Sequence, residues 1–186
     1  GGQVWKTGLL SHRFFQRPGS EGVVQSEPER ILVTGMGPLA QLYFPRPVEM
    51  AERERIASQL IEAGGVPLVL IPDKPGHVTA WTKTGIFTLP ADAAQVLGAD
   101  HPFLEEAAQD LVALCHHPYS GEMIVSGWQP GRPAMTFPPE NGSHAGPGSQ
   151  ETHGFALLPS DAPLPRRGRA YLRPLDLREA AMAFLN

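Results

Sequence analysis

The sequence has little cysteine, no long apolar run and no excess of positive charge, and each shortage excludes a class of protein. The single cysteine, Cys115, excludes an intramolecular disulfide framework and a cage of thiolate metal ligands. No apolar run approaches the roughly 20 residues that cross a bilayer, and the first residues lack the charged and apolar regions of a signal peptide. We therefore expect no membrane segment within this chain, which is compatible with the cytoplasm.

The charge of the chain is weakly negative. Fifteen basic residues stand against 19 acidic ones, for a net charge of −4, and they are spread along the sequence. A protein that binds nucleic acid through its phosphates usually carries a basic stripe or patch. The sequence therefore predicts no nucleic-acid partner.

Glycine and proline are plentiful, with 20 of each among 186 residues, and they predict many turns and long connections. Between the turns, the spacing of apolar residues is typical of an α/β protein. Helices are expected at 47–63, at about 100–115 and at 175–185. The expected strands are 31–34, 39–44, 66–71, 77–81, 86–89, 123–128, 134–137 and 155–158.

One glycine-rich segment, residues 138–153, concentrates polar chemistry between two expected strands, and loops of this kind often carry functional sites. His144 would bind a metal through one ring nitrogen if Glu140 or a carbonyl held the other. Ser143 and His153 are further candidates for contacts with a substrate. The alternative is a surface connection whose histidines are solvated.

The stretch FPPENGSHAGPGSQETHGFALLP, residues 137–159, resembles the closing segment of the alkaline phosphatase superfamily, in its type I phosphodiesterase and nucleotide pyrophosphatase-like members. Those proteins carry a Gly-Ser-His-Gly-Gly-type loop whose histidine binds one of two catalytic metals. Residues 101–128 resemble the helix and strand before that loop. Residues 30–44 and 76–89 resemble a cap-like insertion. The resemblance implies a phosphate ester substrate and His144 as a ligand of a divalent metal, Zn or Mn.

The resemblance also implies a fold and a division of the chain. We expect an α/β protein that forms part of a mixed-sheet, alkaline phosphatase-like core with a small α+β cap. Residues 1–29 would be an arm and linker, residues 30–100 the cap-like subdomain, and residues 101–186 the C-terminal part of the core with a terminal helix.

Two further pairs of residues match the order of metal-ligand motifs in related phosphodiesterases. Asp73 and His77 form Asp-x-x-Gly-His, and Asp100 and His101 are adjacent. Local structure offers a simpler interpretation of both. Residues 73–76 have the composition of a turn, and Asp100 or His101 stands where the following helix needs its cap.

A catalytic nucleophile is not found, because no early segment matches the Ser or Thr at a helix start that superfamily members use. Two-metal chemistry also needs more ligands than His144 alone. The leading hypothesis is therefore the C-terminal portion of a metal-dependent phosphoric ester hydrolase, inactive alone and completed by an N-terminal catalytic half or a partner chain. The alternative is a non-catalytic binding or interaction module that keeps the superfamily's shape.

Overall fold

The computed structural model describes residues 30–136, 146–165 and 168–185. The chain divides into two compact units, Gly1–His153 and Gly154–Asn186. The arm expected at residues 1–29 lies outside the described residues. The described part of the first unit holds a sheet and four helices, and that of the second unit holds one helix.

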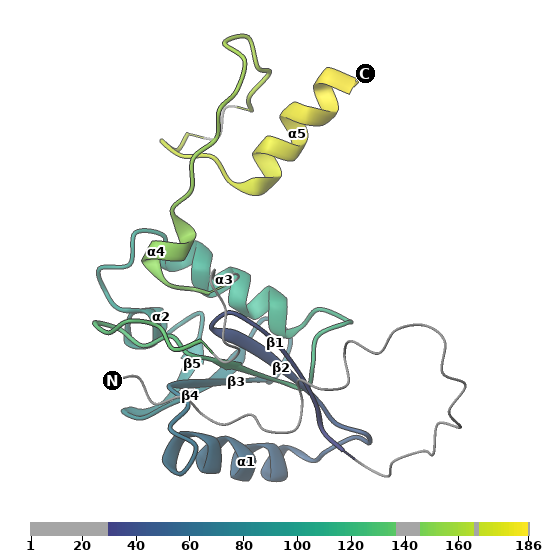
Figure 1. The fold of residues 1–186 in the computed structure, drawn as a ribbon, viewed down its shortest axis with the longest axis vertical. Helices are drawn as coiled ribbons and strands as arrows, with labels where there is room; N and C mark the ends of the chain where they lie inside the picture. The colour runs from purple at the N-terminus through teal and green to yellow at the C-terminus, as the bar shows by residue number, and fades with distance from the viewer. Residues whose placement is uncertain (1–29, 137–145, 166–167, 186) are drawn as a thin grey trace, which may run out of the picture. The chain divides into compact units, whose positions relative to one another are not determined.

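A six-stranded sheet forms the centre of the first unit (Figure 1). The strand order is β1-β2-β6-β3-β4-β5, and every neighbouring pair is antiparallel. The strands are β1 (Leu32–Met36), β2 (Leu39–Tyr43), β3 (Leu68–Pro72), β4 (Val78–Thr82), β5 (Gly85–Leu89) and β6 (Met123–Ser126).

The last of the described strands in chain order, β6, lies in the middle of the sheet. Its final residue, Ser126, is opposite Leu39 at the start of β2 and opposite Leu68 at the start of β3. All four residues of β6 are buried. One end of the sheet therefore gathers the starts of β2 and β3 and the end of β6, and the chain leaves β6 there.

Helices cover both faces of this sheet (Figure 1). Helix α1 (Met50–Glu62) packs on one face, where its Ala57 and Ile61 join a buried cluster. Helices α2 (Ala93–Leu97) and α3 (Leu104–Cys115) cover the opposite face. Because side chains alternate along a strand, Val69 and Ile71 of β3 belong to the first cluster, while Leu68 and Leu70 belong to the second. Burial on both faces explains the continuous apolar run that predicts β3.

The α/β content expected from the sequence is confirmed, with five helices among the described residues. The sequence predicts a mixed sheet, whereas every described strand pair is antiparallel. The boundary expected after residue 100 falls within the first unit, because β6 from the second predicted segment pairs with β2 and β3 of the first.

The strand expected at 155–158 is absent from the described second unit, where Phe155 and Leu157 are almost fully exposed. Helix α5 (Pro174–Leu185) matches the expected terminal helix. Within this unit, the buried carboxylate of Asp176 accepts hydrogen bonds from the guanidinium of Arg169 and, at 2.7 Å, from the backbone N–H of Arg173. An acidic side chain at this position stabilises the start of α5.

None of the helices that the structure describes is both long enough and apolar enough to cross a membrane.

The thiol of Cys115 belongs to the core under α3, and burial raises its pKa from the ordinary value of 9.0 to about 12. The thiolate is the reactive form. We therefore expect dithiobis-nitrobenzoate at pH 8 to modify native protein at least about 100-fold more slowly than protein in denaturant. Equal rates would contradict this burial.

The same pKa shift predicts a loss of stability at alkaline pH. The unfolded thiol ionises near its ordinary pKa, while the folded thiol stays protonated up to about 12. The thiol's contribution to the free energy of unfolding is therefore complete below pH 9 and falls between pH 9 and 12. In denaturant titrations between pH 9 and 12, the Cys115→Ala variant should lack the part of the pH-dependent loss of stability that comes from the thiol.

Candidate functional site

The chain that leaves β6 turns back on itself at the end of the sheet. The N–H of Gly127 donates to the carbonyl of Pro38 at 2.6 Å, and the N–H of Met135 donates to the carbonyl of Gly127 at 2.9 Å. A Cβ atom on Gly127 would overlap the carbonyl of Met135, so only glycine fits there. We call residues 127–135 the strap.

The chain returns to the same place after residues 137–145. The side chain of His101 holds this return through a hydrogen bond of 2.8 Å between its Nε2 and the carbonyl oxygen of Pro147. A Cβ atom on Gly148 would lie 2.6 Å from Cζ3 of Trp128, so the backbone rests directly against the indole ring. The short helix α4 (Ser149–Thr152) follows at once. We call residues 137–145, which contain His144, the His144 segment. The residues that flank it on both sides are therefore held near the end of β6.

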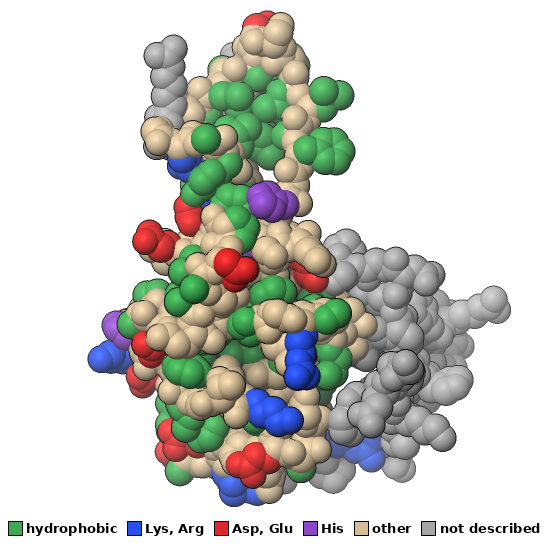
Figure 2. Space-filling model, turned by 90° about the vertical axis from the view of Figure 1, so that its left-hand side faces the viewer, with side chains coloured by type: hydrophobic (Ala, Val, Ile, Leu, Met, Phe, Trp, Pro, Cys, Tyr) green, Lys and Arg blue, Asp and Glu red, His purple; other side chains and the backbone are tan. Residues whose placement is uncertain are grey.

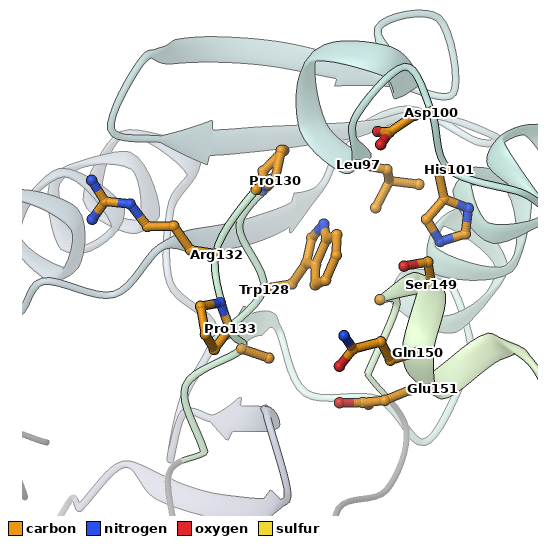
Figure 3. Close-up of a pocket in the computed structure, with 13 residues that line it drawn as sticks. Leu97, Asp100, His101, Trp128, Pro130, Arg132, Pro133, Ser149, Gln150 and Glu151 are labelled. Atoms are coloured by element: carbon orange, nitrogen blue, oxygen red, sulfur yellow. The ribbon is translucent and has the colours of Figure 1, made fainter.

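A pocket of about 400 Å³, the Trp128 pocket, lies between the strap and α4 (Figure 3). In Figure 3 the indole of Trp128 stands in its middle, with the residues of α4 on one side and the strap on the other. The carboxylates of Asp100 and Glu151, the hydroxyl of Ser149 and the amide of Gln150 contribute polar groups. Its remaining lining residues are Leu97, His101, Pro130, Gly131, Arg132, Pro133, Ala134 and Gly148.

His101 is buried and both of its ring nitrogens are engaged. Its Nδ1 accepts a hydrogen bond of 3.1 Å from the N–H of Phe103, which leaves Nε2 as the protonated nitrogen that donates to Pro147. Neither nitrogen has a lone pair free for a metal. For the same reason His101 does not serve as a general base for Ser149. Asp100 lies next to it on the wall of the pocket.

The other predicted pair, Asp73 and His77, closes the turn between β3 and β4. The N–H of Asp73 donates to the carbonyl of His77 at 3.2 Å, and the N–H of His77 donates to the carbonyl of Lys74 at 2.9 Å. This turn follows the end of β3, whereas the Trp128 pocket adjoins its start. The structure therefore does not bring Asp73 and His77 together with Asp100 and His101.

The remaining predicted site residues divide between the described and undescribed parts of the chain. Glu140, Ser143 and His144 lie outside the described residues. His153 is exposed at the end of α4, where its ring meets the edge of Phe103 with 5.0 Å between ring centroids. Within residues 30–136, 146–165 and 168–185, no group of three or more His, Cys, Asp or Glu side chains is arranged to hold a metal ion.

The glycine at position 148 provides a test of this arrangement. A methyl group there would press on the ring of Trp128, so we expect Gly148→Ala to lower the free energy of unfolding by about 1–3 kcal/mol in denaturant titrations. Gly154 is the matched control, because a Cβ there meets no atom within 4 Å, and Gly154→Ala should stay within about 0.5 kcal/mol. Equal effects of the two variants would show that the return segment does not rest against Trp128.

Comparisons of this chain with protein-family models, with curated proteins and with solved structures found no match. The likeness to the alkaline phosphatase superfamily therefore stays a resemblance carried by the residues around His144.

Proposed function

We propose that this chain is the C-terminal portion of a metal-dependent phosphoric ester hydrolase of phosphodiesterase or phosphatase type. In this proposal His144 is one metal ligand, for Zn or Mn, and the surrounding segment covers a phosphate ester substrate. The sheet of the first unit would be the part of an alkaline phosphatase-like core, with its cap, that this chain contributes. Glu140, Ser143 and His153 are candidates for substrate contacts.

The observation that carries the proposal is the fixing of both ends of the His144 segment. On one side Gly127 bonds to Pro38 and Met135 bonds back to Gly127, and on the other side His101 holds Pro147 while Gly148 rests on Trp128. A metal ligand has to be positioned to within a fraction of an ångström, and rigid support around it provides that precision.

The described residues do not by themselves fit a complete metal site, since they contain no group of three ligands. Two-metal hydrolysis requires several ligands around ions that lie about 4 Å apart. The proposal therefore requires that further ligands and the nucleophile come from an N-terminal catalytic half or a partner chain, and it implies that this chain alone is inactive.

The second candidate is a non-catalytic binding or interaction module. Two observations from the described residues favour it: the lack of a metal-ligand group and the engagement of both nitrogens of His101. The pocket around Trp128 would then be the binding site itself. The hydrolase candidate predicts that the protein binds Zn or Mn, whereas the binding module does not require a metal.

A measurement of metal binding, with and without His144, distinguishes the two candidates. Zn or Mn content and hydrolysis of p-nitrophenyl phosphate esters should be measured for the 186-residue chain alone and together with a candidate catalytic partner. We expect His144→Ala to weaken metal binding by about 100-fold or more, because a direct ligand is lost.

His153→Ala is the matched control, because it removes an exposed imidazole near the same segment and should leave metal affinity within about twofold. Undiminished metal affinity in His144→Ala would overturn the assignment of that residue. Failure of the wild-type protein to bind Zn or Mn in either form would overturn the hydrolase proposal and leave the binding module.

A further inference from the structure

A second pocket, of about 580 Å³, lies on the other side of the strap, and we call it the Lys83 pocket. It is built by the end of α1, the turn between β4 and β5, helix α2 and the strap. The two pockets share Trp128, Pro130 and Arg132.

The floor of the Lys83 pocket is apolar. Ile61, Leu68 and Val96 belong to the two core clusters and are buried, and Val66 packs against one of those clusters. Met135 adds a flexible apolar side chain from the strap. A volume of about 580 Å³ falls within the usual range for small-molecule sites, which bury most of the ligand against apolar side chains. The floor therefore suits the apolar body of a ligand.

The rim of the pocket is cationic. Lys83 lies in the turn between β4 and β5, Arg132 lies in the strap, and both side chains are exposed. Neither makes a hydrogen bond or ion pair within the described part of the chain, and no Asp or Glu is among the residues that line the pocket. On the face seen in Figure 2, Lys and Arg side chains are visible among apolar ones. Two cationic side chains with no carboxylate beside them among the lining residues favour the binding of an anionic ligand.

The indole of Trp128 adds a further donor. Its Nε1 is buried and has no hydrogen-bond partner among the described residues. A buried donor without a partner destabilises the protein, so a ligand oxygen that accepted a hydrogen bond from it would remove a penalty that the free protein carries. Because Trp128 lines both pockets, the NMR signal of its indole N–H should shift when a ligand binds in either of them.

We propose that the Lys83 pocket binds an amphiphilic anion, whose apolar body lies over Ile61, Val96 and Met135 and whose phosphate or carboxylate group lies at Lys83 and Arg132. Arginine and lysine together provide charged donors for anionic oxygens, and the apolar floor adds area that a free inorganic ion cannot use. The site does not depend on the hydrolase proposal, since none of the residues named here belongs to the His144 segment.

Binding of decyl phosphate to the full chain tests the site directly. The ligand is used below its micelle-forming concentration, in calorimetry and in NMR spectra of the indole N–H groups, with the Trp128 signal assigned from Trp128→Phe. We expect saturable one-to-one binding that shifts the Trp128 signal, and affinity at least about tenfold higher than for decanol or inorganic phosphate. Equal affinity for decanol would remove the role of the anion, and equal affinity for inorganic phosphate would remove the role of the apolar floor.

Variants of the two rim cations, Lys83 and Arg132, locate the anion. We expect Lys83→Ser and Arg132→Ser each to weaken decyl phosphate binding about tenfold, because each removes a charged donor. Lys74→Ser is the matched control, since Lys74 is an exposed lysine in the turn at the opposite end of β3 and β4 and should leave the affinity unchanged. An equal loss in the Lys74 variant, or no loss in the other two, would overturn the proposal.

Discussion

The insertion of β6 between β2 and β3 is the constraint on which the rest of the first unit depends. Ser126 ends β6 opposite the first residues of both neighbours, so the chain must leave the sheet at the point where those strands begin. The strap follows β6 at that end, where the N–H of Gly127 donates to the carbonyl of Pro38 and the N–H of Met135 donates back to the carbonyl of Gly127. Both pockets and both ends of the His144 segment are located there for this reason.

Local elements could largely be predicted from the sequence, because their signals are local. The spacing of apolar residues and the acidic residues near its start indicate α1, and glycine and proline mark the turns between strands. The central position of β6 could not be predicted in this way, since it depends on pairing with β2, which lies about 80 residues earlier in the chain. The strand expected at 155–158 has the right composition, but it pairs with no strand of the described residues.

The candidate site was predictable only in part. Composition alone singles out the His144 segment, and the turn at Asp73 follows from local rules. The cap expected at Asp100 or His101 is wrong, because α3 begins at Leu104 after Phe103 and no side chain caps it. The second contact of His101, with the carbonyl of Pro147, joins positions 46 residues apart, so the residues near His101 in sequence do not predict it. The same holds for the Lys83 pocket, which α1, the turn between β4 and β5, α2 and the strap build together.

The central position of β6 also determines when the sheet can become continuous. Until residues 123–126 have left the ribosome, the strands made earlier can form only two separate ribbons, β1-β2 and β3-β4-β5. Each ribbon then has an unpaired apolar edge, at β2 and at β3, of the kind that invites pairing with another chain. The nascent chain therefore passes through a stage in which the future centre of its sheet is open to pairing with other chains.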